Sequence, residues 1–467
     1  EELCFNYGLE VEDDEDPECM RVEIAANRYD LLSVEGLAIN LGRYLGTIEP
    51  ATYTIREVST HEKLIVKKSV ETIREVCVCA ILRGIKFTKE SYDSFIDLQD
   101  KLHHNLGRKR TLVSFGTHDL DTIKGPFVYE ALTPTEIEFV ALNKTEKTNA
   151  HQLFEALNKD LHLKPFLKIL EGKPHFPVIK DSNGVVLSLP PIINGEHSKI
   201  SLNTKNVFIE VTATDYTKAM MGLTNIITAF SLYCEKKFEV EQVEIHYEGT
   251  DKNDITPHMK SHVLTANVDY MNKRAGINIT KDEAIKLLHK MGFTTLKSEG
   301  NDLTLEVPLY RSDILHACDV SEDLAIAYGY NNIVPQLPPV TTIGKQVDLN
   351  KMTEQLRHEM ATAGYKECLN FALCSIKDNT TNLNLPETLP MVTIGNSKTF
   401  DFQAGRTNLL SGLLKTLLSN KKNKLPIELF EVSDVVIRND SEIGAANERH
   451  LAALRTNLKG SELSVNS

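Results

Sequence analysis

Apolar and polar positions follow two different periods along the chain, and both helices and strands are expected from them. Mostly apolar runs, which are typical of buried strands, lie at 76–85, 111–115, 185–189 and 207–211. Apolar positions recur at helical spacing in 91–106, where Gly107 ends the pattern, and again in 220–233. The mixture predicts one α+β domain over about 66–250.

A smaller unit is expected over about 255–335. Its first helix begins at a capping box of Thr280 and Glu283 and ends at Gly292. A strand follows at LTLEVP, and a second helix is predicted over Asp313–Tyr328, with Gly329 as its stop. The Pro-rich LPPV at 337–340 is typical of a linker.

We expect one further domain at each end of the chain. An amphipathic helix ending at Gly42 belongs to an N-terminal domain over 1–65, and a helix followed by mixed strands and helices fills 340–467. A chain of 467 residues exceeds a single core, and at about 100–200 residues per domain we expect three or four domains. The predicted fold class is α+β, multidomain.

The composition indicates in which cellular compartment the protein works and how it can contact nucleic acid. No run of about 18 apolar residues is present, so we expect no membrane span and no secretory leader. Eight scattered cysteines without a CxxC motif favour a reducing, cytoplasmic compartment over a zinc site. The net charge of −13 means that any contact with nucleic acid is local or is aided by a partner chain.

The helix predicted over Asp313–Tyr328 carries a cluster of carboxylates. Asp319, Glu322 and Asp323 fall on one polar side, and Asp313 falls in the first turn, where negative charge suits the helix dipole. No Lys or Arg lies within the helix to offset their repulsion. Hard oxygen ligands of this kind suit Mg²⁺ or the basic groups of a partner, and the alternative is a solvated polar face.

Four blocks of sequence carry a resemblance to a known family. They are ANRYDLLSVEGLA at 26–38, PVIKDSNGVVLSLPPIINGEHSKI at 177–200, VPLYRSDILHACDVSEDLAIAYGY at 307–330 and NSKTFDFQAGRTNLLSGLLKTLLSN at 396–420. In this order they resemble the β subunit of phenylalanyl-tRNA synthetase, of the eukaryotic cytosolic and archaeal type. The resemblance covers nearly the whole chain. Members of the family start earlier and continue further, so we expect both ends to be missing here.

The resemblance implies a fold and partners for each part of the chain. It implies an editing domain at 66–250, a winged-helix-like domain at 255–335, and an inactive class II synthetase-like antiparallel core at 340–467 that serves assembly. It implies a heterotetramer of two α and two β subunits that joins phenylalanine to tRNA(Phe), with ATP bound by the α subunit. A Mg²⁺ shared with that subunit is linked in the family to the positions of Asp313, Asp319, Glu322 and Asp323.

An editing site is expected because a binding pocket alone separates phenylalanine from tyrosine poorly. Phenylalanine and tyrosine differ by one hydroxyl, and a hydrophobic pocket rejects an added hydroxyl only ~100-fold. A second site that hydrolyses Tyr-tRNA(Phe) needs polar groups that phenylalanine would leave unpaired. In similar archaeal-type β subunits, the pocket is lined by the positions of Ser188, Asn194, Glu210, Thr212 and Arg83.

One of these positions departs from the family, since related chains carry Asp where this chain has Glu210. We hypothesise that Glu210 or Asn194 binds the phenol hydroxyl and that Arg83 lies near the tRNA 3′ end. From the residues alone, PPIING at 190–195 is equally typical of a rigid turn between strands. His118 is a candidate base or a local hydrogen-bonding residue, and otherwise a positioned water would hydrolyse the ester.

Two rival functions remain open from the sequence. One is a non-catalytic scaffold that binds nucleic acid through the winged-helix-like unit. The other is a free-standing hydrolase of mischarged tRNA, which would have no use for residues 340–467. No GxxxxGK[ST] loop occurs, so a P-loop enzyme is excluded.

Overall fold

The structure is a computed structural model that describes residues 1–12, 19–250, 253–337, 340, 342 and 344–458. It is mixed α/β and divides into two compact units, Glu1–Gln336 and Leu337–Ser467. The linker predicted at 337–340 lies at this division, and its positions 338 and 339 fall outside the described residues. Within the described ranges, no helix combines the length and the apolar character needed to cross a bilayer.

An eleven-stranded sheet is the centre of the first unit. Nine strands follow the order β12-β11-β10-β7-β4-β14-β5-β13-β6, and β3 and β15 each pair with β14. Their bounds are Thr54–Ile55 for β3, Glu62–Val66 for β4, Val76–Arg83 for β5, Val113–Asp119 for β6, Phe127–Leu132 for β7, Phe176–Lys180 for β10, Val186–Leu189 for β11, Ile193–Asn194 for β12, Asn206–Ala213 for β13, Glu239–Tyr247 for β14 and Asn253–Thr256 for β15.

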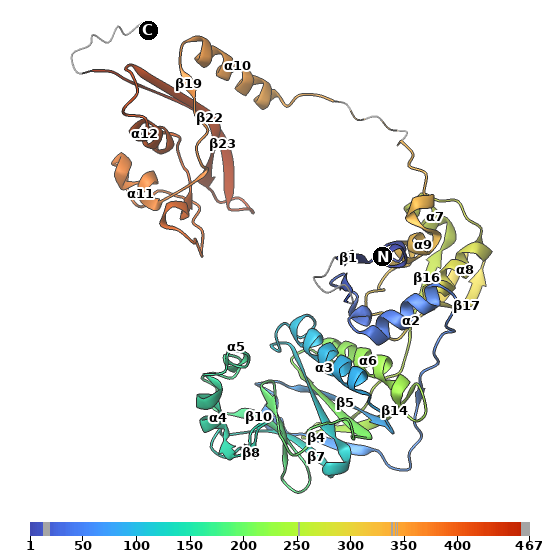
Figure 1. Cartoon of the computed structure of the whole chain (residues 1–467). Coiled ribbons are helices and arrows are strands. Elements are labelled where there is room, and N and C mark those ends of the chain that lie inside the picture. The colour runs from blue at the N-terminus through green and yellow to red at the C-terminus, as the bar shows by residue number, and fades with distance from the viewer. Residues whose placement is uncertain (13–18, 251–252, 338–339, 341, 343, 459–467) are drawn as a thin grey trace. The chain divides into compact units, whose positions relative to one another are not determined.

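Two helices cover one face of this sheet. α3 (Lys89–His104) begins at a capping box of Thr88 and Ser91, and α6 (Tyr216–Phe230) begins at an Asp215 cap. Figure 1 shows the two helices side by side over β5. Their apolar sides share a core with alternate residues of β5 and β13, and the remaining residues of both strands, Cys77, Cys79 and Phe208 among them, are buried on the opposite face. Burial on both faces explains why these strands are mostly apolar.

The sheet curls so that distant strands meet. β11 and β13 are far apart in the strand order, yet the Ser188 hydroxyl on β11 donates to Glu210 on β13 at 2.8 Å. A separate core under α4 (Ala150–Leu157) and α5 (Lys164–Leu167) closes the side near β10 and β11. The space between β13, β11 and these short helices is where the candidate site lies.

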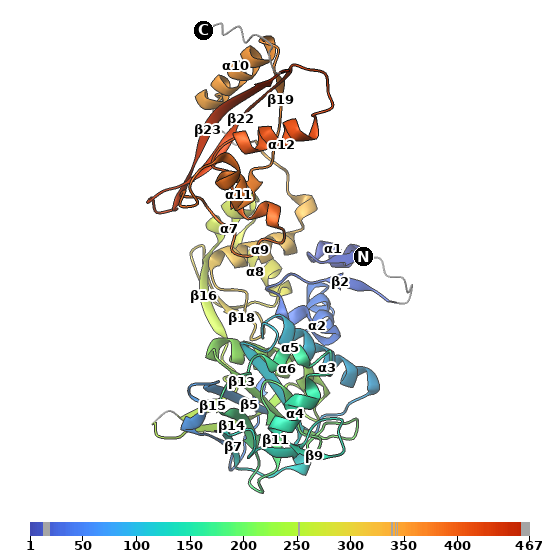
Figure 2. The same ribbon diagram turned by 90° about the vertical axis from the view of Figure 1, so that its left-hand side faces the viewer.

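The smaller unit predicted after residue 255 has three strands and three helices. The sheet order is β16-β18-β17, with bounds His262–Asn267, Asp302–Val307 and Thr294–Glu299. The helices α7 (Val268–Ala275), α8 (Lys281–Lys290) and α9 (Ala317–Tyr328) gather beside this sheet (Figure 2). The capping box of Thr280 and Glu283 opens α8, as the sequence predicted.

The N-terminal segment has its apolar residues in the core of this smaller unit. Cys4, Tyr7, Leu9 and Leu31 pack in one cluster with residues of 266–324. The elements of the segment are α1 (Glu2–Asn6), β1 (Glu10–Glu12), β2 (Arg21–Glu23) and α2 (Val34–Tyr44). Residues 1–44 and 262–328 therefore share a hydrophobic core, although the eleven-stranded sheet separates them in sequence.

The start of α9 corrects one expectation from the sequence. The helix begins at Ala317, after the N-cap His316, and not at Asp313. The reason is the Asp319 carboxylate, which accepts hydrogen bonds from the backbone N–H groups of Leu315 and His316, both at 2.8 Å. Asp319 is thus the acidic residue of the first turn, and Asp313 lies in the loop before the helix.

The second unit is built on a long antiparallel hairpin. β22 (Ile427–Arg438) pairs with β23 (Ala445–Thr456) along twelve residues, and β19 (Lys366–Glu367) pairs with β22 in parallel. α10 (Asp348–Thr362) and α12 (Leu410–Ser419) accompany the sheet, with α11 (Ile376–Asn379) and the short pair β20 (Leu373–Cys374) and β21 (Ala404–Gly405). A buried ion pair between Arg406 and Glu431, at 2.6 Å, joins the loop before α12 to β22.

Candidate active site in the curled sheet

A cavity of about 360 Å³ opens between β13, β11, β12 and the segment that follows α3. Its volume is in the range of small-molecule sites. One group of lining residues is apolar: Phe115, Leu142, Leu157, Leu163, Pro190, Pro191, Ile192 and Ile193. The other group is polar: Gln99, His103, Arg110, Ser114, Asn143, Lys144, Asp160, His162, Ser188, Asn194 and Glu210.

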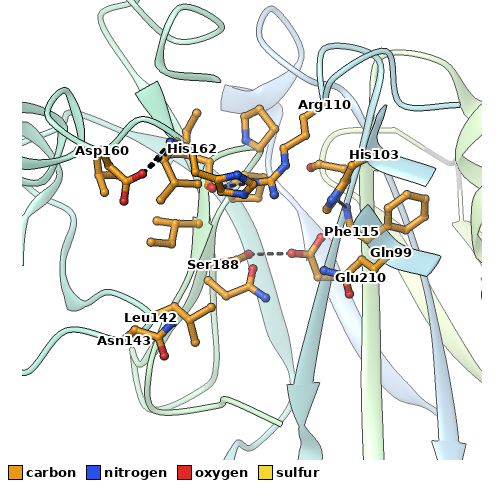
Figure 3. Close-up of a pocket in the computed structure, with 18 of the residues that line it drawn as sticks. Gln99, His103, Arg110, Phe115, Leu142, Asn143, Asp160, His162, Ser188 and Glu210 are labelled. Carbon is orange, nitrogen blue, oxygen red and sulfur yellow. Dashed lines mark hydrogen bonds between the residues drawn. The ribbon is translucent and has the colours of Figure 1, made fainter. Parts of the chain in front are cut away.

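Glu210 is the most deeply buried carboxylate of this lining, with 1% of its surface exposed. Figure 3 shows it pointing toward Ser188, whose hydroxyl donates to Oε1 at 2.8 Å. The second oxygen, Oε2, is buried and accepts no hydrogen bond from the described residues. An unsatisfied buried carboxylate oxygen is costly, so it marks a place where a ligand can donate a hydrogen bond.

Gly116 makes room for this carboxylate. It is the partner of Glu210 in the β6–β13 register, and a Cβ on it would lie 2.1 Å from Glu210 Oε1. His118, two residues further along β6, is fully buried, and its Nε2 lies 3.8 Å from Glu210 Oε1 without a hydrogen-bond partner among the described residues. Its Nδ1 meets the Ser198 hydroxyl at 2.8 Å, which is the local hydrogen-bonding role that the sequence left open.

Two more unsatisfied polar atoms belong to the same lining, His103 Nδ1 and Arg110 Nε. The backbone N–H of Phe115 donates to His103 Nε2 at 2.9 Å, so in the neutral ring the proton is on Nδ1. Burial lowers the pKa of His103 to about 4, so this ring is neutral at neutral pH. Three unsatisfied polar atoms around one cavity are the arrangement expected of a binding site, since native structures pair nearly all buried polar groups.

Arg110 ties three walls of the cavity together. Its guanidinium lies over the Phe166 ring, 4.4 Å from the centroid, and donates through Nη1 to the Ile192 carbonyl at 2.9 Å. Asp100, on α3, lies 3.8 Å from Nη2. Burial lowers the pKa of Arg110, but a guanidinium stays protonated in proteins, so Arg110 brings a positive charge to the lining.

The structure gathers three of the five predicted pocket residues at this cavity. Ser188, Asn194 and Glu210 line it. Thr212 lies behind the lining, where its hydroxyl meets Ser114 at 2.9 Å and accepts from Arg74 Nε at 3.1 Å. Its role is thus to hold β13 against β6 and the buried Arg74.

Arg83 is not among the residues of the cavity lining. It pairs in register with Asn206, four residues before Glu210 on β13, which is about 13 Å along a strand. Its guanidinium forms two hydrogen bonds with Glu241, of 2.7 and 2.8 Å. A contact between Arg83 and the tRNA 3′ end stays a prediction.

Sequence reasoning missed the side of the cavity that α3 and its following turn supply. Gln99, His103 and Arg110 come from a segment whose apolar positions predict a helix and nothing more. The available signal was the run GRKR at 107–110, four residues after His103. Gly116 also escaped notice, because the space that a glycine leaves is visible only when its strand neighbour is known.

The carboxylates predicted to bind Mg²⁺ fall into two pairs. Asp313 and Asp323 both bind Arg311, whose side chain is fully buried, through contacts of 2.7 to 3.0 Å. Burial raises the pKa of Asp323 in spite of this neighbour. Arg311 therefore supplies the positive charge that the sequence did not place beside the helix, and these two carboxylates do not fit a metal site.

The other two carboxylates, Asp319 and Glu322, do not bind Arg311. They line a depression of about 290 Å³ with Cys318, Arg274 and Tyr330. Glu322 is exposed, and the hydrogen bonds from Leu315 and His316 outweigh partial burial and lower the pKa of Asp319. No three His, Cys, Asp or Glu side chains converge within the described part of the chain, so Asp319 and Glu322 fit at most half of a metal site.

Family models match nearly the whole length of the chain. They are described as the Phe-tRNA synthetase β subunit B1 domain over residues 1–47, the B3/4 domain over 78–250, the tRNA synthetase B5 domain over 264–330 and the phenylalanyl-tRNA synthetase β chain CLM domain over 333–464. The cavity lies within the part matched by the B3/4 domain, and α9 lies within the part matched by the B5 domain.

Whole proteins show the same likeness. The phenylalanine–tRNA ligase β subunits of Caenorhabditis elegans and Homo sapiens are 47% and 46% identical to this chain, over 98% of it and 81% of each relative. The Arabidopsis thaliana protein of that name, described as cytoplasmic, is 44% identical over 97% of this chain and 80% of its own length. An N-terminal fragment of the Pyrococcus horikoshii phenylalanyl-tRNA synthetase β subunit matches 70% of this chain and 92% of that fragment, with a TM-score of 0.64 and 30% identity. The chain therefore belongs to the phenylalanine–tRNA ligase β subunit family.

Proposed function

We propose that this chain, together with an α subunit, forms a cytoplasmic phenylalanine–tRNA ligase and that its cavity hydrolyses tyrosine wrongly attached to tRNA(Phe). The observation that carries the editing role is the free Oε2 of Glu210 in the cavity lining. A tyrosine ring would pack between Phe115 and the apolar Pro190–Ile193 wall, and its hydroxyl would donate to Oε2.

Glu210 gives this site its selectivity. Phenylalanine in the same place would leave the buried oxygen unpaired, and sites built to bind a hydroxyl reject the analogue that lacks it by about 10⁴-fold or more. Asn194, opposite Ser188 in the β11–β12 register, supplies an amide at the same wall. The Asp of related chains and the Glu of this chain carry the same charge, and the space beside Gly116 accommodates the longer side chain.

Hydrolysis breaks the ester bond between tyrosine and the terminal ribose. Water adds to the carbonyl carbon, the ribose oxygen leaves and takes a proton, and free tyrosine and tRNA(Phe) are released. His103, with a pKa of about 4, is too weak a base to drive this step at neutral pH. We therefore assign the attack to a water positioned by the polar lining.

The second unit supports the proposed subunit partnership. α12 carries Leu410, Leu414 and Leu418 at a four-residue spacing, with 45%, 42% and 65% of their surfaces exposed. Phe371, in the same unit, is 78% exposed. Exposed apolar residues in such a row are typical of an interface. In our proposal this unit docks the α subunit, which binds ATP and phenylalanine, in an assembly of two α and two β subunits.

We also propose a Mg²⁺ site at α9. Asp319 and Glu322 would offer two carboxylate ligands from this chain, and the α subunit and water would complete the shell. The ion would supply positive charge that joins acidic groups of the two subunits. Asp313 and Asp323 hold Arg311 in place and have no part in the ligand set that we propose.

The test is a Glu210→Leu substitution in the α–β complex. Leu fills the space of Glu and removes the acceptor, so Tyr-tRNA(Phe) hydrolysis should fall about 100-fold, equivalent to about 2.7 kcal/mol of transition-state stabilisation. Phe-tRNA(Phe) formation should stay unchanged. Glu299→Leu, at an exposed position of β17, is the matched control.

Three outcomes would contradict the proposal in different ways. Unchanged hydrolysis in Glu210→Leu removes this residue from the site. A complex that neither charges nor deacylates tRNA leaves the non-catalytic scaffold as the surviving hypothesis. Deacylation by the chain alone, without charging in the presence of an α subunit, identifies a free-standing hydrolase.

A further inference from the structure

The chain takes an unusual course directly after α3. Arg108, Lys109 and Arg110 all have positive φ, at 46°, 54° and 66°. Six non-glycine residues have positive φ among those described, and half of them are in this one turn. Each such residue costs about 1–2 kcal/mol because its Cβ crowds the following carbonyl.

Hydrogen bonds to the end of α3 hold the turn in this shape. The N–H of Lys109 donates to the His104 carbonyl at 3.3 Å, and the N–H of Arg110 donates to the His103 carbonyl at 3.1 Å. Arg110 lines the cavity, with its guanidinium over the Phe166 ring and a hydrogen bond donated to the Ile192 carbonyl. The turn is therefore fixed at the cavity wall through its third residue.

The other two residues of the turn are exposed. Arg108 and Lys109, two positions and one position before the anchored Arg110, project their charges to solvent. The stretch 101–112 contains four Lys or Arg residues and no Asp or Glu, in a chain with a net charge of −13. The turn is thus a local basic feature beside the cavity.

A purely structural role does not account for the strain. Basic residues after a helix favour its dipole by about 0.3–1 kcal/mol, and they do so in any backbone conformation. Three residues in the left-handed region cost several-fold more than this gain. Strain of this size is typical of functional positions, where the geometry itself is needed.

We infer that Arg108 and Lys109 form a phosphate-binding rim that holds the 3′-terminal nucleotides of the aminoacylated tRNA while Arg110 fixes the rim to the cavity. The inference rests on the proposed editing function, because it takes the amino acid of that substrate into the cavity. With the ester at the opening, the phosphates of the last nucleotides come next along the RNA strand. A guanidinium and an ammonium are the groups that bind phosphate oxygens in proteins.

The test replaces both residues by glycine, Arg108→Gly with Lys109→Gly, in the α–β complex. Glycine adopts positive φ without strain, so the turn is kept and the thermal midpoint should stay the same or rise. The matched control removes two exposed neighbouring charges from the second unit, Lys421→Ala with Lys422→Ala.

The readouts are tRNA(Phe) binding and Tyr-tRNA(Phe) hydrolysis across a salt series. Each lost phosphate contact should lower the slope of log affinity against log salt by about 0.7, so the double glycine variant should lose about 1.4. Its KM for Tyr-tRNA(Phe) should rise about tenfold or more with little change in kcat, because uniform binding is lost. Hydrolysis of tyrosine ethyl ester, which has no phosphate, should not change.

If the glycine variant binds tRNA(Phe) with the same salt dependence as the wild type, Arg108 and Lys109 do not form a phosphate-binding rim. An equal loss on Tyr-tRNA(Phe) and on the small ester also overturns the rim, because that result would place the effect inside the cavity. A complex that binds tRNA with the expected change in slope but hydrolyses no Tyr-tRNA(Phe) supports the rim and refutes the editing proposal.

Discussion

At the scale of single residues, the site depends on the fit between a carboxylate and a missing side chain. Glu210 is buried between Ser188, which uses one of its oxygens, and Gly116, which has no side chain to displace it. The remaining oxygen is free because this arrangement brings no second donor to it. Selectivity between two amino acids that differ by one hydroxyl would thus depend on the space that a glycine leaves.

We expect Gly116→Ala to disable editing while leaving the fold intact. The new Cβ would lie 2.1 Å from Glu210 Oε1, so the carboxylate must move away from Ser188. Overpacking of this kind costs about 1–3 kcal/mol, and displacement of the acceptor should reduce Tyr-tRNA(Phe) hydrolysis about tenfold or more. Deacylation kinetics and a thermal melt measure the two effects.

Gly395→Ala is the control for this change, because a Cβ added at Gly395 would meet no atom within 4 Å. It should alter neither hydrolysis nor the thermal midpoint. Full activity in Gly116→Ala would show that Glu210 does not need its present position.

At the scale of elements, the sequence predicted strands and helices best where burial alone decides them. β5 and β13 are mostly apolar because both faces are covered, and this pattern needs no knowledge of the partners. The start of α9 was missed because the Asp319 carboxylate accepts the backbone hydrogen bonds of Leu315 and His316, while Arg311 holds Asp313 in the loop before the helix. The left-handed turn of Arg108–Arg110 was missed because none of its three residues is a glycine, and Gly107 before it predicts only the end of the helix.

The same reasoning separates the site residues that could be predicted from those that could not. Ser188, Asn194 and Glu210 come from one continuous part of the chain, and the family resemblance predicted them together with Thr212, which lies behind the lining. His103 and Arg110 join them only because the sheet curls, and that curvature depends on contacts between strands at opposite ends of the strand order. Local sequence carries no record of such contacts.

The ion pairs of Arg311 lead to a prediction for α9. Asp323→Asn removes one carboxylate from a fully buried guanidinium, and breaking a buried pair costs about 3–5 kcal/mol. The first unit should therefore unfold at a clearly lower temperature. Because the lost partner is Arg311 and not a metal ion, the shift should be the same with Mg²⁺ and with a chelator.

Glu322→Gln is the comparison for this experiment, since Glu322 is exposed on the same helix. It should leave the thermal midpoint of the isolated chain unchanged. If chelation alone reproduced the effect of Asp323→Asn, that carboxylate would be a metal ligand and our assignment would be wrong.

At the scale of the whole molecule, the two compact units are joined by a segment without helix or strand in its described residues, between Asn332 and Asp348. Leu337 and Val347, near its two ends, are 96% and 62% exposed. Exposed backbone without regular hydrogen bonding is the preferred substrate of proteases.

Limited proteolysis should therefore cut first between Gln336 and Asp348. Two resistant fragments are expected, and mass spectrometry would identify their ends. The larger fragment should keep the thermal transition of the first unit, because each unit has a hydrophobic core of its own. Loss of both fragments at the same rate would show that the units are stable only together.

The core shared by residues 1–44 and 262–328 has a consequence for the history of the protein. The polypeptide leaves this core, builds the whole curled sheet and its cavity, and then returns to finish the domain it had left. In genetic terms the eleven-stranded sheet with its cavity is an insertion into a host domain. Insertions whose two ends meet at the surface of a host can be gained, lost or exchanged as one piece. In our proposal, a single recombination event therefore adds or removes proofreading without rebuilding the host fold.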